Sequence, residues 1–169
     1  MKKITYTMKL LSSLIVSPRS GQALYKEIDE FCLSPYVKIP DTKDDEKHEV
    51  RVVYPFYQYG EYERYDPEHA NYYLPGSSVK GALLQHKRKG FKLMADDVPV
   101  PNLSIVLRSL WKAQYLDDVG KAGFALFFDN VGIEMIKDGT ELDGDLYLEE
   151  NIAFSEILET VNKDTKDKI

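Results

Sequence analysis

The chain has 169 residues, of which 43% are apolar and 12% aromatic, so it has the size of one domain and enough apolar side chains for a core. No stretch approaches the ~20 apolar residues of a membrane span, and the single cysteine, Cys32, excludes an intrachain disulfide and a multi-cysteine zinc site. The net charge of −6 is unlike the basic excess of a freestanding nucleic-acid-binding domain. With no signal-peptide cleavage pattern after the first apolar run, these features predict a cytoplasmic protein without membrane contact.

The first third of the chain contains short apolar segments separated by turn residues. Residues 4–10 are rich in β-branched and aromatic side chains and predict an opening strand that continues to about residue 16. Residues 23–31 have apolar side chains at helical spacing and predict a short helix, whereas residues 50–54 predict a strand. The acid-rich residues 41–49 indicate a solvated surface.

Tyrosines are concentrated in the next segment, at positions 54, 57, 59, 62, 65, 72 and 73. Exposed rings in a loop of this kind stack on nucleic-acid bases, because every base offers a π face. Alternatively, the segment packs as an ordered flap over the sheet or against a neighbouring subunit. The sequence leaves both interpretations open.

The segment that follows, residues 71–92, contains no acid and five basic residues: Lys80, Lys87, Arg88, Lys89 and Lys92. Residues 75–87 predict a loop that leads into a helix, because Gly76 permits a tight turn and Ser77 or Ser78 is a good N-cap. A turn of this kind presents free backbone N–H groups and the positive end of the helix dipole to an anion. The segment therefore predicts a phosphate-binding site.

Side chains strengthen this prediction. Lys80 lies in the first helical turn and reaches the same anion, while Gly81 lets a second backbone approach. The order Lys80-Gly81 does not match a P-loop, and the dinucleotide fingerprint is absent. The predicted nucleic-acid-binding residues are Gly76, Ser77, Ser78, Lys80, Gly81, Lys87, Arg88 and Lys89. The alternative is that this is only a well-capped helix.

The second half of the chain consists mainly of strand-like segments. Residues 103–116 fit either a helix or a strand by periodicity. Residues 132–136 and 142–148 predict a hairpin around a Gly-containing turn. Residues 154–161 predict an amphipathic helix that is followed by a frayed polar tail. Further short strands are predicted at residues 91–94 and 125–128. Strands in the first and last thirds, with helices between them, predict an α+β fold.

Residues 74–83, Leu-Pro-Gly-Ser-Ser-Val-Lys-Gly-Ala-Leu, resemble the signature of the RAMP superfamily of CRISPR-associated proteins, usually I-P-G-S-S-[LIV]-K-G-[AVT]-[LI]-R. Leu84 stands where that signature commonly has a basic residue. Residues 94–97 and 132–144 are similar to two further blocks of type III effector subunits, and their order looks most like the cap subunit of the Csm complex. The resemblance covers about residues 1–150 and is specific at residues 74–83.

The resemblance implies a ferredoxin-like (RRM-like) antiparallel sheet with helices on one face over residues 1–150, followed by a short C-terminal helix and polar tail in residues 151–169. It also implies that residues 103–116 form a strand. The implied function is a non-catalytic, RNA-binding structural subunit of a type III CRISPR ribonucleoprotein. Its implied partners are the guide RNA, the target RNA and other effector subunits, and no cofactor is expected.

Catalysis is the main alternative, because processing nucleases of this superfamily use a histidine as general acid or base. We therefore consider a metal-independent endoribonuclease that processes CRISPR repeat RNA, with His48, His69 and His86 as candidates. None of them lies in a matching family motif, and no motif selects one of the aspartates that precede the glycine-rich helix: Asp29, Asp41, Asp44, Asp45 and Asp66. Asp96 and Asp97 are interpreted as a strand-end turn instead of a metal pair. We predict neither catalytic nor metal-binding residues. A third hypothesis is a scaffold that contacts only protein.

Overall fold

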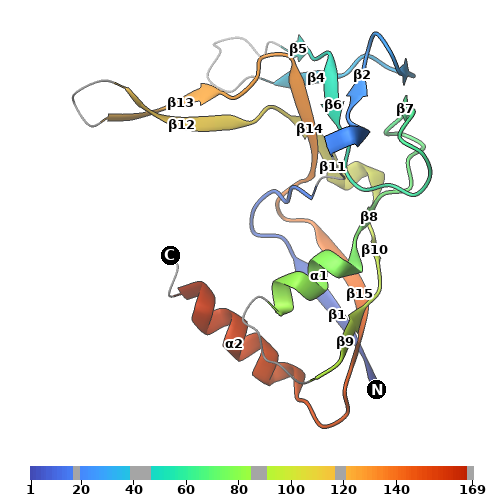
Figure 1. Ribbon diagram of the computed structural model, residues 1–169, viewed down its shortest axis with the longest axis vertical. Coiled ribbons are helices and arrows are strands. Elements are labelled where there is room, and N and C mark those ends of the chain that lie inside the picture. Colours follow the sequence, from blue (N-terminus) through green and yellow to red (C-terminus); the bar gives the residue numbers. More distant parts are fainter. Residues whose placement is uncertain (17–19, 39–46, 85–90, 117–120, 167–169) are drawn as a thin grey trace.

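The computed structural model describes residues 1–16, 20–38, 47–84, 91–116 and 121–166. Most regular structure in this part of the chain is strand, and there are two α-helices, so the predicted α+β class is confirmed. The molecule is elongated, with a lower part that holds both helices and an upper part from which a hairpin projects (Figure 1). Neither helix is long and apolar enough to cross a membrane.

The lower sheet is antiparallel and has the strand order β1–β15–β9, with β1 (Lys2–Lys9), β15 (Glu141–Leu148) and β9 (Leu93–Ala95). β1 and β15 pair along their full length. Side chains in β1 alternate between half-buried and exposed, as expected when one face of a strand covers a core. Among the described residues, no strand pairs with the outer edge of β1.

Both helices pack on the apolar face of this lower sheet. α1 (Gly76–Leu83) buries Val79, and α2 (Phe154–Lys166) buries Ile157 beside Leu146 of β15. The predicted helix at 154–161 is confirmed, but it continues through Lys166, so most of the predicted frayed tail is helical.

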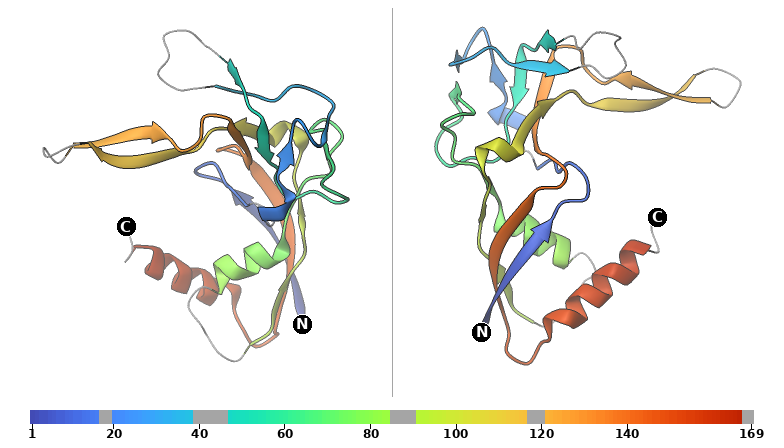
Figure 2. Two further views of the ribbon diagram at one scale, coloured as in Figure 1. Left: turned by 45° about the horizontal axis from the view of Figure 1, so that its top comes forward. Right: turned by 180° about the vertical axis from the view of Figure 1, so that it is seen from behind.

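The upper sheet has the order β11–β14–β6–β2, with β11 (Ile105–Arg108), β14 (Val131–Ile136), β6 (Val52–Tyr54) and β2 (Leu24–Tyr25). Two smaller strand pairs lie in the upper part (Figure 1): β3 (Glu30–Phe31) with β7 (Arg64–Tyr65), and β4 (Tyr36–Lys38) with β5 (Lys47–Glu49). A third pair, β10 (Val98–Pro99) with β8 (Tyr73–Leu74), lies beside β15 of the lower sheet. The hairpin of β12 (Trp111–Leu116) and β13 (Lys121–Leu126) extends away from both sheets in every view (Figure 2). Short 3-10 turns span Ser20–Gln22 and Asn102–Ser104.

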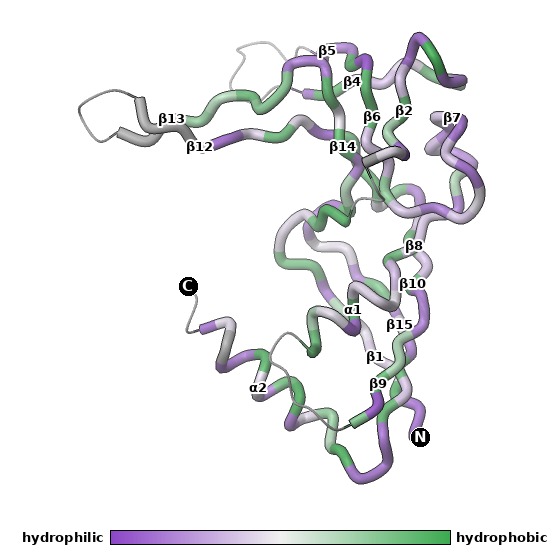
Figure 3. Tube along the Cα trace, in the orientation of Figure 1, coloured by the Kyte–Doolittle hydropathy of each residue, from purple (hydrophilic) through white to green (hydrophobic). Residues whose placement is uncertain are grey.

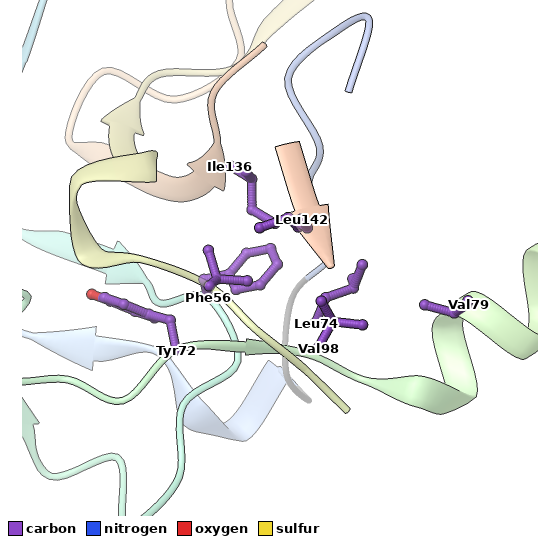
Figure 4. Close-up of a cluster of buried hydrophobic side chains, with 8 residues drawn as sticks. Phe56, Tyr72, Leu74, Val79, Val98, Ile136 and Leu142 are labelled. Carbon is purple, nitrogen blue, oxygen red and sulfur yellow. The ribbon is translucent and has the colours of Figure 1, made fainter. Parts of the chain in front are cut away.

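One apolar cluster joins the two parts of the molecule. Phe56 from the tyrosine-rich segment and Ile136 from the end of β14 are fully buried in it. Leu142 of β15 and Val79 of α1 enter the same cluster from the lower part (Figure 4). The position of α1 is therefore fixed by a core that both sheets share.

Two sequence predictions are wrong for identifiable reasons. Residues 23–31 form β2, a turn and β3 instead of a helix, because Leu24 is buried in strand pairing with Val53 and the Tyr25 N–H donates to Asp29 Oδ2 at 2.7 Å. Residues 132–148 do form two strands, but not a hairpin. β14 pairs with β11 and β6, and β15 pairs with β1 and β9, so the turn between them transfers the chain from one sheet to the other.

The remaining predicted strands are present in the structure, although their first and last residues differ from the predictions. The opening strand is β1, although it ends at Lys9, and Leu14 makes only an isolated bridge to Ile136. Residues 103–116, which periodicity left open, begin with a 3-10 turn and then form β11 and β12. The strand expected at residues 50–54 is β6.

Candidate nucleic-acid interface at the start of α1

The predicted loop-to-helix transition is present, but its N-cap differs from the prediction. Pro75 is the N-cap residue, and no side chain caps the helix locally, so the prediction of a Ser77 or Ser78 cap is wrong. Asp97, which follows β9, supplies the carboxylate instead: its Oδ1 accepts a hydrogen bond from the Gly76 N–H at 2.8 Å. A negative charge at this place is stabilised by the helix dipole.

The carboxylate changes how this helix start can bind an anion. The Ser78 and Val79 N–H groups both donate to the Pro75 carbonyl, at 2.9 and 3.2 Å. Three of the first four helical N–H groups therefore have partners within the protein, and the Ser77 N–H is the one without an acceptor among the described residues. A phosphate at this site would be bound mainly by side chains instead of by a row of backbone amides.

The two glycines of the motif have different surroundings. A Cβ added at Gly76 would lie 2.1 Å from the Ala95 carbonyl oxygen and 2.8 Å from the Asp96 carbonyl carbon. Gly76 is therefore required for close packing of α1 against the end of β9. A Cβ at Gly81 would meet nothing within 4 Å. Gly81 is exposed, so its small size leaves helix backbone accessible from outside.

The outer surface of α1 is formed by Ser77, Lys80 and Gly81, all of which are exposed. The helix contains no acid, and Lys80 makes no ion pair with any carboxylate in the described part of the chain. The remaining predicted residues, Lys87, Arg88 and Lys89, lie outside the described residues. We refer to Ser77, Lys80 and Gly81 as the α1 strip.

The tyrosine-rich segment has mainly a packing role. Tyr65 and Tyr72 are buried. Tyr59 is the exception, with 58% of its surface exposed. Its ring stacks on Tyr73 with 4.2 Å between centroids and 16° between planes, and its hydroxyl donates to Asp97 Oδ2 at 3.1 Å. Asp97 thus connects the one exposed stacked tyrosine to the start of α1.

The sheet face opposite the helices carries carboxylates. Asp145 of β15 accepts a hydrogen bond from Thr5 at 2.8 Å and pairs with Lys3 at 2.9 Å. The hydrogen bond from Lys3 lowers the pKa of Asp145, so this carboxylate stays charged. Asp143 accepts a hydrogen bond from Thr7 at 2.6 Å on the same face. Lys9 pairs with Glu141 on the same face, so acidic and basic side chains alternate there and little of this face is free to bind a phosphate chain.

Within the described residues, the candidate catalytic residues His69 and Asp66 are brought into contact, and the others are not shown close to them. His48 lies on β5, His69 contacts Asp66, and His86 lies outside the described residues, as do Asp41, Asp44 and Asp45. Asp29 accepts a hydrogen bond from the Tyr25 N–H in a tight turn. Within the described ranges, no group of three or more His, Cys, Asp or Glu side chains is arranged to hold a metal ion.

One acidic side chain is buried in the core and is not part of the α1 strip. Glu134 of β14 is only 2% exposed; its Oε2 accepts the Phe56 N–H at 2.9 Å and its Oε1 accepts the Tyr72 hydroxyl at 2.7 Å. Burial raises the pKa of Glu134 to about 7. Both oxygens are engaged with the core, so we assign this acid a structural role.

No protein-family model matches the chain, and no curated protein matches it either. Sequence reasoning located α1 and Lys80 but missed Asp97 as the anion at the helix start, because 21 residues separate it from Gly76. It also missed the pairing of His69 with Asp66, for which the i, i+3 spacing in a Pro-containing turn was a usable signal.

Proposed function

We propose that this chain is a non-catalytic, RNA-binding structural subunit of a type III CRISPR ribonucleoprotein, with its RNA contact on the α1 strip. The observation that carries the proposal is the exposed, acid-free outer surface of α1, on which Lys80 stands without a carboxylate partner among the described residues. A lysine beside accessible helix backbone contacts sugar-phosphate without reading base sequence. This suits a subunit that follows a guide or target strand.

We further propose that the lower part is a ferredoxin-like domain. That fold runs strand–helix–strand–strand–helix–strand. The lower part runs β1, α1, β9, β15 and α2 in chain order, with β15 between β1 and β9 in the sheet. Five of six elements thus occur in the expected sequence. The strands of the upper sheet come from two segments, one between β1 and α1 and one between β9 and β15. In this proposal both segments are insertions into the ferredoxin-like domain.

The RNA contact in this proposal differs from that of an RRM. An RRM stacks bases on aromatic residues of its open sheet face. Here Asp143, Asp145 and Lys3 occupy that face together with Tyr147, so it is mainly charged and not aromatic. The strand would instead pass over the α1 strip, where Ser77 offers a hydroxyl and an N–H and Lys80 an ammonium group. Tyr59 offers the free face of a stacked ring nearby, because Asp97 links it to Gly76.

Lys80→Glu is expected to weaken binding of single-stranded RNA by about tenfold at low salt, because it removes one phosphate contact and adds repulsion. Fluorescence anisotropy with a labelled RNA of mixed sequence measures the effect. Lys163→Glu is the matched control, because it makes the same charge change on the exposed surface of α2. Equal losses in the two variants would mean that only net charge matters and would contradict a contact at α1.

A further inference from the structure

A polar hollow of about 240 Å³ lies in the tyrosine-rich segment, apart from the α1 strip. It is lined by Gln58, Tyr59, Gly60, Glu61, Arg64, Asp66, His69, Ala70 and Asn71. The trace around β7 is correspondingly hydrophilic (Figure 3). The hollow is smaller than the ~300 Å³ at which pockets for drug-sized ligands begin. Its size and polarity suit one sugar-phosphate unit better than a free apolar ligand.

The loop that carries the hollow is held rigidly. The two N–H groups of the Asn102 side-chain amide are shared among three carbonyls of one turn: Pro67 at 2.8 Å, Glu68 at 3.1 Å and Ala70 at 2.9 Å. The turn is also closed by the Ala70 N–H, which donates to the Asp66 carbonyl at 3.0 Å. An irregular loop with this many hydrogen bonds is ordered before any ligand arrives. Preorganisation of this kind reduces the entropy lost on binding.

The central pair in the hollow is His69 with Asp66. His69 Nδ1 lies 2.9 Å from Asp66 Oδ1, and that hydrogen bond lowers the pKa of Asp66. The carboxylate is therefore charged and accepts the Nδ1 proton. In neutral His69 this leaves Nε2 as a hydrogen-bond acceptor. The Asp66 side chain is only 13% exposed, whereas the His69 side chain is 75% exposed.

The charges that face the hollow favour a hydroxyl-bearing ligand over a free anion. Arg64 is the one fixed cation, and its Nη2 lies 3.5 Å from Asp66 Oδ2. Glu61 adds a second carboxylate to the lining. A free phosphate would meet two acids and one arginine, which is not a favourable balance. A ribose offers hydroxyl donors to these acceptors, and its phosphates can remain outside the hollow.

We propose that the hollow binds one ribose of the RNA strand and distinguishes RNA from DNA. His69 Nε2 accepts the hydrogen bond of the 2′-hydroxyl, and the adjoining phosphates lie outside the hollow, away from Asp66 and Glu61. Tyr59, which lines the hollow and stacks on Tyr73, supports the base. The 2′-hydroxyl is the group that separates the two nucleic acids at a single site. This inference rests on the proposed RNA-binding function and adds a specificity to it.

The test compares the affinities of RNA, of DNA of the same sequence, and of 2′-fluoro RNA, which lacks the hydroxyl donor. Wild-type protein is expected to bind RNA about fivefold more tightly than either analogue, which corresponds to one hydrogen bond. His69→Ala is expected to abolish that preference and to leave the affinity for DNA unchanged. Lys80→Glu is expected to weaken all three ligands equally, because its contact is to phosphate.

The outcomes separate the two proposals. If His69→Ala retains the full preference for RNA, the ribose site is wrong while the α1 contact stands. If Lys80→Glu binds as wild type and His69→Ala loses its preference, the α1 contact is wrong and the ribose site stands. RNA scission in EDTA that disappears in His69→Ala would support the contact between His69 and the 2′-hydroxyl, but it would overturn the proposed non-catalytic function, since His69 would then act as a general base on that hydroxyl.

Discussion

Gly76→Ala is expected to lower the free energy of unfolding by about 1–3 kcal/mol, because the added methyl group overpacks a site that has no room for it. The new Cβ would lie 2.1 Å from the Ala95 oxygen, and the obstructing atoms are backbone atoms that cannot rotate away. Relief requires α1 to move from β9, which also weakens the hydrogen bond from Gly76 to Asp97. Urea unfolding followed by circular dichroism measures the change.

Gly81→Ala is the matched control within the same helix. Its Cβ would meet no atom within 4 Å, and alanine is favoured over glycine in a helix by about 0.8–1 kcal/mol. We therefore expect Gly81→Ala to raise stability while Gly76→Ala lowers it. A similar loss in both variants would contradict the separate roles of the two glycines. If the α1 strip contacts RNA backbone at Gly81, the stabilised variant will also bind RNA more weakly than wild type.

The stability of the protein is expected to fall by about 3 kcal/mol between pH 4.5 and 7 through Glu134 alone. Burial raises the pKa of Glu134 from 4.5 to about 7. Below pH 4.5 the carboxyl group is protonated in both the folded and the unfolded chain. Between the two values only the folded chain holds the proton, so rising pH favours unfolding. Above pH 7 the folded chain carries a buried charge, and the loss is complete.

Glu134→Gln isolates this contribution, because the amide keeps the shape and remains neutral at every pH. Its oxygen can still accept a hydrogen bond from the Phe56 N–H or the Tyr72 hydroxyl. We expect the difference in unfolding free energy between wild type and Glu134→Gln to change in favour of the variant from pH 5 to pH 8. Parallel stability curves over that range would contradict a buried, proton-holding Glu134. Chemical denaturation at several pH values provides the comparison.

The elements with strong local signals could be predicted from the sequence. β1 alternates along its length, α1 follows a Pro-Gly turn, and α2 has an apolar stripe. The wrong predictions concern segments whose structure depends on pairing with strands that are distant in the sequence. Leu24 lies in a segment with helical spacing, but pairing with Val53 made it a strand. The strand at residues 142–148 was expected to return beside β14, but pairing with β1 placed it in the other sheet.

The candidate site could likewise be predicted only where its residues are close together in the sequence. The residues of the α1 strip were predicted, because their spacing within one helix is a local property. Asp97, whose carboxylate binds the N–H of Gly76 at the start of α1, was not predicted. It reaches Gly76 only after β9 has joined the sheet. The ribose hollow needs Asn102 to hold a turn that lies more than thirty residues earlier in the chain. Such contacts carry no periodic signal in the sequence.

Photo-crosslinking of the full chain to RNA that contains 4-thiouridine, followed by peptide mass spectrometry, addresses the RNA contact directly. We predict crosslinks in peptides that contain Ser77 and Lys80, with additional crosslinks at Tyr59. Crosslinks confined to the open face of the lower sheet, or none above the level seen with Lys80→Glu, would show that α1 does not hold RNA.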